Sequence, residues 1–228
     1  MSAPRTARAR IRAQLTEEIL TAAHEEMAEH GAAGLSLRAV ARRLEMVPSA
    51  VYRYFPNRDA LLTALIVDAY LALAAAARAA DGSSGTAPID RWLAVTACVR
   101  RWGHEHRHEW ALLYGSPVPG YRGSGETTAA SLGVTRVLCQ IFVDARPQPV
   151  HLPAPDPAVG RAVAPIEADL LPGFGPDVIT AAVMAWTQLF GMVSLELFGH
   201  YVGATTDFEV VFHYSMRVVA SLVGLPDF

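Results

Sequence analysis

Apolar residues recur at intervals of three and four along most of this 228-residue chain, and this helical spacing limits the fold more than any other feature of the sequence. Leu15, Ile19, Ala23 and Met27, for example, would lie on one face of a helix over about 12–30. We find no stretch with the alternation of apolar and polar residues that indicates a half-buried strand. The chain is therefore predicted to be all-α.

The same spacing predicts eight more helices, separated by segments rich in glycine, proline and serine. They cover residues 36–44, 48–55, 57–80, 88–102, 105–114, 126–144, 177–199 and 207–223. Eight of the fifteen prolines lie between Pro147 and Pro176, so this segment is predicted to be a long irregular loop. Apolar residues make up 52% of the chain and charged residues 18%, which excludes a disordered protein.

Three features indicate a cytoplasmic protein without a membrane partner. The first residues lack the apolar core of a signal peptide. The apolar segment from Val178 to Leu197 is long enough to span a membrane, but it contains Gln188 and Glu196 and is predicted to be buried in protein. Cys98 and Cys139 lie in apolar helical stretches, where we expect free, buried thiols rather than a disulfide framework.

Positive charge is concentrated at the N-terminus. Residues 1–60 contain nine arginines and seven acidic residues, whereas residues 61–228 contain ten arginines and fifteen acidic residues. Four of the arginines lie within the first twelve residues, ahead of any acidic residue. A basic arm over residues 1–13 that precedes an acidic body indicates a polyanionic partner.

Two short predicted helices, 36–44 and 48–55, are separated by only three residues. Ser36 is a favourable N-cap for the first helix, and Pro48 suits the first turn of the second. A helix pair with these lengths and this spacing is typical of the helix-turn-helix, whose first helix crosses the DNA backbone and whose second enters the major groove. We therefore expect Ser36, Arg38 and Arg42 to lie along the DNA backbone. The alternative is an amphipathic helix pair that serves only to build a core.

The outward-facing residues of the second helix are small or polar: Pro48, Ser49, Ala50, Tyr52 and Arg53. Among them, Arg53 is the side chain that can form a bidentate pair with guanine. The hydroxyls of Tyr52 and Tyr54 suit phosphate oxygens at the rim of the groove. Asn57 and Arg58 begin the next helix, whose free N–H groups form an anion site.

The segments SLRAVARRL at 36–44 and VYRYFPNRDALL at 51–62 resemble the TetR family of bacterial one-component regulators over about residues 12–74. The resemblance implies a three-helix DNA-binding domain over 14–74 and a larger helical ligand-binding and dimerisation domain over 75–228. It also implies that Tyr52, Tyr54 and Arg58 contact phosphates and that Ser49 to Arg53 lie at base edges. A weaker resemblance over 92–121 is to the WHG class of C-terminal domains in that family.

The turn of the motif departs from the family pattern. Glu45 occupies the place of the usual glycine, Val47 the place of a hydroxyl cap, and Ser49 the place of an early glycine. If the position of Glu45 requires a positive φ, glutamate costs roughly 1 kcal/mol there. Its negative charge would also oppose DNA.

Residues 104–108 read HEHRH, which matches the H-E-x-x-H pattern. On one helix, His104 and His108 would share a face and could bind zinc, with Glu105 as the general base of a metallopeptidase. The intervening His106 and Arg107 are polar, which favours a solvated helix corner instead. No metal, cofactor or catalytic residue is predicted.

Aromatic residues in the second half of the chain indicate an apolar effector. The predicted ligand-binding residues are Trp102, Trp110, Tyr114, Trp186, Gln188 and Phe190, with Arg101, Glu167 and His200 as further polar anchors. The last two helices are apolar almost all round, which is common at oligomer interfaces. The predicted dimer contacts are Trp186, Val193, Leu197, Val211, Tyr214, Val218 and Leu222.

The sequence thus predicts a homodimeric repressor that binds a palindromic DNA operator and is released by a small apolar effector. Two alternatives remain: a constitutive DNA-binding protein without an effector, and the zinc enzyme.

Overall fold

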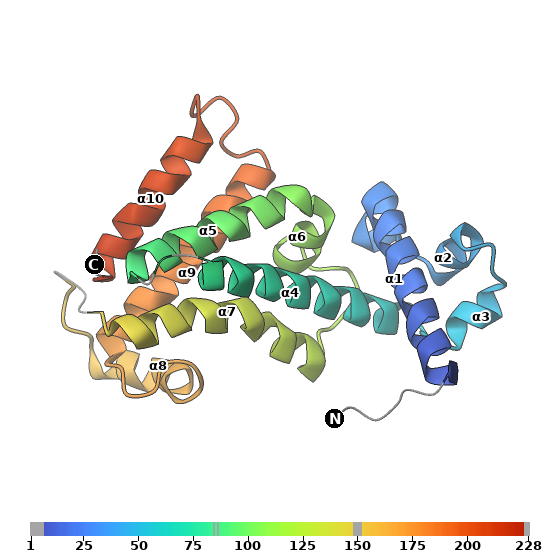
Figure 1. The fold of residues 1–228 in the computed structure, drawn as a ribbon, viewed down its shortest axis with the longest axis horizontal. Coiled ribbons are helices and arrows are strands. Elements are labelled where there is room, and N and C mark those ends of the chain that lie inside the picture. The colour runs from blue at the N-terminus through green and yellow to red at the C-terminus, as the bar shows by residue number, and fades with distance from the viewer. Residues whose placement is uncertain (1–6, 84, 86, 148–151, 226–228) are drawn as a thin grey trace. The chain divides into compact units, whose positions relative to one another are not determined.

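The computed structural model of the chain describes residues 7–83, 85, 87–147 and 152–225. Within these residues all regular secondary structure is helical (Figure 1), which confirms the all-α prediction. The helices are α1 (Ala7–Gly34), α2 (Leu37–Arg43), α3 (Pro48–Tyr52), α4 (Arg58–Ser83), α5 (Pro88–Glu105), α6 (Arg107–Tyr114), α7 (Gly125–Ala145), α8 (Pro157–Asp169), α9 (Pro176–Leu197) and α10 (Phe208–Leu222).

The chain forms two compact units. The first contains the residues up to Ala69 together with His108–Ala130, and the second contains Tyr70–Arg107 and Ser131 onward. Helices α4 and α7 therefore contribute residues to both units. The boundary predicted near residue 74 lies close to the first crossing point, but the sequence did not indicate that α6 belongs with the N-terminal helices.

A single hydrophobic core holds the first unit together. Ile19 and Ala23 of α1, Val40 of α2, Val51 of α3 and Leu62 of α4 are fully buried in it. Residues that follow α5 complete this core, since half-buried residues of α6 and of the segment after it pack against it: Leu112, Val118 and Tyr121. Burial of these side chains supplies the main stabilising free energy of the unit.

In the second unit α10 packs against α5 and α9. The indole Nε1 of Trp92 in α5 donates a hydrogen bond of 2.9 Å to the backbone carbonyl of Met216 in α10, so the most buried tryptophan of α5 has its polar atom satisfied. Helix α7 approaches α4 so closely that a Cβ on Gly133 would lie 2.8 Å from the Cβ of Ala74. Glycine at this position permits the close approach.

One helix that was not predicted and the start of α1 are the main differences from the predicted helices. Helix α8 lies in the proline-rich segment that was predicted to be irregular, because Asp156 caps it by accepting from the amide of Ala158 at 2.7 Å and Pro157 occupies its first turn. Helix α1 begins at Ala7, so most of the predicted basic arm is helical, whereas residues 1–6 lie outside the described residues. Gly31, directly after the predicted end of this helix at about residue 30, has φ 71° and marks a break in it.

Both cysteines are free and buried, as predicted. Two described helices, α4 and α9, have the length and apolar composition that could cross a membrane. Each also buries part of its surface in the protein, which is how a long core helix behaves.

Candidate nucleic-acid interface and cavity

The turn between α2 and α3 is closed by backbone hydrogen bonds. The amide of Met46 donates to the carbonyl of Ala41 at 2.9 Å, and the amide of Leu44 donates to the carbonyl of Val40 at 3.1 Å. Within the turn, Glu45 has φ 54°, in the left-handed region that normally favours glycine. Position 45 therefore adopts the backbone conformation that suits the glycine usual in this family. Glutamate has a Cβ, and the backbone strain expected for it applies at this position.

The inner faces of α2 and α3 fix the orientation of the pair. Leu37, Val40 and Ala41 of α2 are buried, as are Val51 of α3 and Phe55 directly after it. Within each helix these positions are three or four residues apart, as expected for one buried helical face. The outer face of α3 is consequently held toward solvent by the core beneath it.

Most predicted DNA-contacting residues lie on the outer faces of α2 and α3. The exposed ones are Arg38, Arg42, Pro48, Ser49, Tyr52 and Arg53, and Ala50 is half-buried. Val47, at the N-cap of α3, is also exposed and offers no side-chain cap. Ser36 has the extended backbone of an N-cap, but its hydroxyl makes no capping hydrogen bond to α2.

The N-terminal turns of α1 add a basic groove beside α3. Arg8 and Arg12, which are four residues apart, line this groove together with Arg53. The guanidinium of Arg12 lies 5.5 Å from the centre of the Tyr54 ring, within cation–π range. The sequence analysis predicts that these arginines lie in an N-terminal arm. Their spacing of four residues, however, is the one that aligns side chains on a helix.

Asn57 and Arg58 make intramolecular contacts. The Asn57 side chain accepts from the amide of Ala60 at 2.8 Å and so caps α4. Arg58 Nη2 donates to the carbonyls of Ala32 and Ala33 at 2.8 and 3.1 Å, and its Nε donates to that of Leu35 at 3.1 Å. The half-buried guanidinium is thus turned toward the end of α1. The family resemblance implies instead that this side chain contacts a phosphate.

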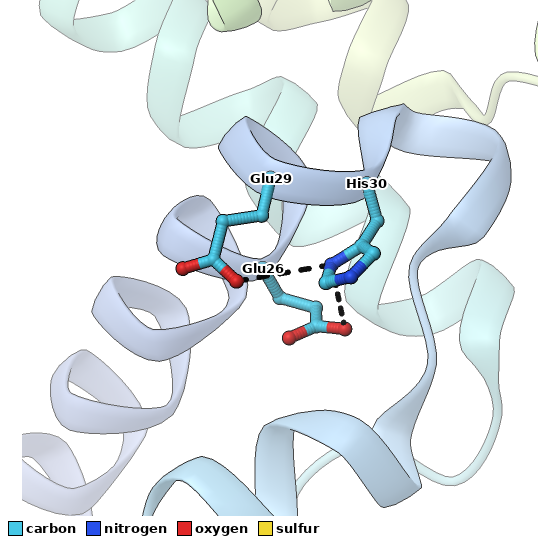
Figure 2. A group of neighbouring side chains, drawn as sticks. All are labelled: Glu26, Glu29 and His30. Carbon is cyan, nitrogen blue, oxygen red and sulfur yellow. Dashed lines mark ion pairs between the residues drawn. The ribbon is translucent and has the colours of Figure 1, made fainter.

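Figure 2 shows Glu26, Glu29 and His30, one group of potential metal ligands on α1. His30 Nδ1 lies 3.2 Å from Glu26 and 4.0 Å from Glu29. However, Arg43 of α2 already forms ion pairs with both carboxylates, with Nη2 2.6 Å from Glu29 and 3.2 Å from Glu26. Its hydrogen bond lowers the pKa of Glu29. The arrangement is that of an ion-pair clamp between α1 and α2.

The H-E-x-x-H pattern does not form a zinc site in the described structure, because the helix ends within it. His106 has φ −125° and ψ 53°, its ring stacks on Trp102, and α6 begins at the next residue. His104 lies in the second unit, where it approaches Glu196 of α9 at 3.0 Å, whereas His108 belongs to the first unit. The two histidines therefore do not share a helix face.

An apolar cavity of about 190 Å³ lies in the second unit and is partly open to solvent, since Val183, one of its lining residues, is 40% exposed. Its walls come from α5, α7, α8 with the residues after it, and α9: Trp92, Thr135, Leu138, Cys139, Phe142, Ile166, Leu170, Leu171, Ala182, Val183 and Trp186. The four residues from α7 follow helical spacing and form one face of that helix. The indole Nε1 of Trp186 donates to the Thr135 hydroxyl at 3.2 Å, and burial raises the pKa of the Cys139 thiol to about 11.

The predicted ligand-binding residues do not gather around this cavity. Trp186 lines it, and the buried Phe190 stacks on Trp186. Trp102 is buried against His106 elsewhere in the second unit, and Gln188 is exposed. Trp110 and Tyr114 belong to the first unit. The further polar anchors do not line it either: Arg101, Glu167 and His200 are exposed.

The predicted dimer residues fall into two groups. Trp186 and Val193 face the interior of the second unit, because α9 directs that side into the core, and Leu197 is half-buried. Val211, Tyr214, Val218 and Leu222 are 39–69% exposed and, at spacings of three and four, form an apolar stripe along α10. Helix α9 also has exposed apolar residues: Val183, Met184 and Leu195.

Two family models match the chain. The model described as "Bacterial regulatory proteins, tetR family" matches residues 19–65, the region of the helix-turn-helix. The model described as "Tetracyclin repressor-like, C-terminal domain" matches residues 92–219, more than half of the chain.

Curated and solved relatives agree with these matches. The chain is 38% identical over 222 residues to the HTH-type transcriptional regulator Mb1846 of Mycobacterium bovis and to Rv1816 of Mycobacterium tuberculosis, covering 93% of this chain and 94% of each relative. The crystal structure of the regulatory protein SCO4313 superposes with a TM-score of 0.78 at 30% identity, covering 95% of this chain and all of that one.

Proposed function

The chain belongs to the TetR family of DNA-binding transcriptional regulators, and we propose that it is a homodimeric repressor that a small apolar effector releases from a palindromic operator. The observation that carries the DNA-binding part is the exposed outer face of α3. Ser49, Tyr52 and Arg53 lie there, held by a buried inner face, beside a groove lined by Arg8 and Arg12. Small residues next to one guanidinium suit a base edge, and the flanking arginines suit phosphates.

Charge near this surface favours DNA over an uncharged partner. The arginines on or beside it are Arg8, Arg12, Arg38, Arg42 and Arg53, and all of them are exposed. Glu45 is the acidic residue within the turn. Neutralising phosphates with these side chains releases counterions, so the affinity for DNA is expected to fall steeply as salt concentration rises.

The ligand-responsive part is supported by the apolar cavity of the second unit and by the course of α4. This helix starts with Arg58 beside the C-terminal end of α1 and continues unbroken to Ser83 in the second unit. A ligand that favours one position of α4 would shift the conformational equilibrium of the helix-turn-helix, because this motif packs against the first turns of α4. Coupling of this kind typically changes affinity about 5–150-fold. A constitutive DNA-binding protein without an effector is the alternative.

Dimerisation is part of the proposal because a palindrome presents two half-sites about 34–36 Å apart. The apolar stripe along α10 supports it, since exposed apolar surface of this kind marks an association site. A repressor of this kind would work in the cytoplasm, without catalytic activity or a metal. The zinc enzyme is not favoured, because His104 and His108 lie in different units.

The test is selection of bound sequences from a random duplex library, followed by fluorescence anisotropy titrations at two salt concentrations. We expect a palindromic consensus and salt-sensitive binding. Arg53→Ala should relax the preference at one base pair in each half-site, by about 1–3 kcal/mol. Arg42→Ala is the matched control, because loss of a phosphate contact weakens all duplexes alike. If no duplex is enriched, or if binding is independent of salt, the proposal fails.

A further inference from the structure

The cavity of the second unit defines the chemistry of its occupant more narrowly than "small and apolar". We propose that it binds a neutral molecule the size of a single substituted ring, such as toluene or benzyl alcohol, and that it excludes charged molecules of the same shape. This inference rests on the proposed function only for its regulatory meaning, because binding itself can be measured without DNA.

Volume sets the size of the ligand. The cavity measures about 190 Å³. A dry protein cavity of about 150 Å³ lined by aliphatic and aromatic side chains accommodates benzene. The extra space allows one or two further heavy atoms on a six-membered ring, whereas a second fused ring would exceed this volume and extend into the opening at Val183.

The walls exclude charge. Among the described residues that line the cavity there is no arginine, histidine, aspartate or glutamate. The raised pKa of Cys139 keeps its thiol protonated at neutral pH. A carboxylate or ammonium ion that entered would lose its hydration without gaining a counter-ion, and this cost is large. Neutral ligands carry no such penalty.

One polar group can orient a ligand. The Thr135 hydroxyl accepts a hydrogen bond from Trp186 Nε1 at 3.2 Å, and a hydroxyl that accepts one bond can still donate its own proton. A ligand with one hydroxyl, ether or carbonyl oxygen is therefore accommodated as well as a pure hydrocarbon. This is why benzyl alcohol is expected to bind alongside toluene.

Two sides of the cavity lie close to solvent. Ile166 and Leu170 line the cavity from the α8 side, and no described residue of α8 is buried. On the α9 side, Val183 lines the cavity and is 40% exposed. The cavity therefore already has an opening through which a ligand can enter without disrupting the packing of α5, α9 and α10.

The direct test is isothermal titration calorimetry on the full-length protein without DNA, together with tryptophan fluorescence, since Trp92 and Trp186 both line the cavity. The probes are toluene, benzyl alcohol, benzoate, benzylammonium, naphthalene and decanoate. We expect the two neutral single-ring probes to bind, and the charged probes to bind at least about 100-fold more weakly. Benzoate or benzylammonium binding as tightly as benzyl alcohol would overturn the inference, as would tighter binding of naphthalene or decanoate.

Two variants locate the binding. Ala182→Phe fills the cavity from α9 and should abolish binding of toluene, whereas Ala129→Phe makes the same change at an exposed position of α7 that does not line the cavity and should leave it unchanged. Leu170→Ala enlarges the cavity and should admit naphthalene. If Leu170→Ala does not fold, Ile166→Val provides a smaller enlargement. Unchanged toluene binding by folded Ala182→Phe would overturn the assignment of this cavity.

Adding operator DNA separates this inference from the proposed function. If toluene binds in the cavity and operator affinity is unchanged, the ligand assignment stands and the release mechanism fails. If neutral single-ring molecules do not bind but another compound releases the operator, the mechanism stands and the ligand assignment fails.

Discussion

The guanidinium of Arg58, the first residue of α4, lies 2.8 Å from the backbone carbonyl of Ala32 at the end of α1. Helix C-termini leave carbonyls without intrahelical partners, and a cation there also offsets the helix dipole. With Ala33 and Leu35 as further acceptors, Arg58 links α1 to α4 within the first unit. A side chain that a family pattern associates with DNA is thus engaged in holding the DNA-binding unit together.

Arg58→Ala is therefore expected to act on stability. Loss of hydrogen bonds from a charged donor to partly buried carbonyls should lower the free energy of unfolding by about 1–3 kcal/mol. Urea denaturation followed by circular dichroism measures this. DNA titrations on the folded variant should retain the salt dependence of the wild type, because no phosphate contact is lost.

Arg38→Ala is the control for this pair of measurements. Arg38 is exposed on α2, so its removal should leave stability unchanged and reduce the salt dependence of DNA binding. If the Arg58→Ala protein instead has wild-type stability and its DNA binding depends less on salt, Arg58 contacts a phosphate.

Glu45→Gly should both stabilise the protein and tighten its binding to DNA. Glu45 has φ 54°, and glycine adopts this conformation without the cost of a Cβ, which is roughly 1 kcal/mol. Removal of a negative charge from the turn also reduces repulsion of phosphates. Thermal denaturation and anisotropy measure the two effects separately.

Glu45→Ala separates the two causes, because alanine retains the Cβ and loses the charge. We expect its stability to stay close to that of the wild type and its DNA affinity to rise as in Glu45→Gly. Equal stability of the glycine and alanine variants would argue against backbone strain at this position.

His24 should make the first unit less stable in mildly alkaline buffer. Burial lowers the pKa of this imidazole, but Glu109 of α6 and Asp68 of α4, at 3.3 and 3.4 Å, outweigh burial and raise the pKa above its ordinary value of 6.5. A raised native pKa means that the protonated ring stabilises the fold fully below the unfolded pKa of about 6.5. This contribution is lost as the pH rises through the native pKa.

The measurement compares urea midpoints of the wild type and of His24→Gln at pH 6 and at pH 8.5. Between pH 6 and pH 8.5 the urea midpoint of the wild type should fall more than the midpoint of His24→Gln. The variant lacks the titrating imidazole at position 24 and retains the other histidines. Parallel changes in the two proteins would show that His24 does not contribute.

Local signals explain why the helix-turn-helix was predictable. Asn57 caps α4 and Pro48 begins α3, and both effects depend on neighbouring residues. The inward stripe of α2 likewise follows from helical spacing. Arg58 differs, because its acceptors lie 23–26 residues away in the sequence, and nothing local indicates that contact.

The ligand residues were less predictable for a related reason. An aromatic residue in a core helix looks the same in sequence whether it lines a cavity or fills a core. Trp110 and Tyr114 belong to the first unit because α5 ends at Glu105 and α6 then contacts α1, where Glu109 lies 3.3 Å from His24. The cavity residues Leu138 and Phe142 have ordinary core spacing on α7, so only the tertiary arrangement distinguishes them.

The apolar stripe on α10 leads to the last prediction. Tyr214 and Val218 are 69% and 39% exposed, and they lie one turn apart in the middle of the stripe. If two copies of α10 pack there, a charge in the centre would be buried without a partner, which typically costs several kcal/mol. Tyr214→Asp and Val218→Asp should each convert the dimer to a monomer at micromolar concentration in sedimentation velocity runs.

Arg136→Glu is the matched control, because it changes an exposed residue of α7 away from the stripe and should leave the dimer intact. Monomeric variants should retain the wild-type circular dichroism spectrum, since both side chains face solvent within one chain. Their operator affinity should fall strongly, because each half-site is then bound by a separate molecule. A wild-type protein that sediments as a monomer, or a Tyr214→Asp dimer as stable as the wild type, would place the association surface elsewhere.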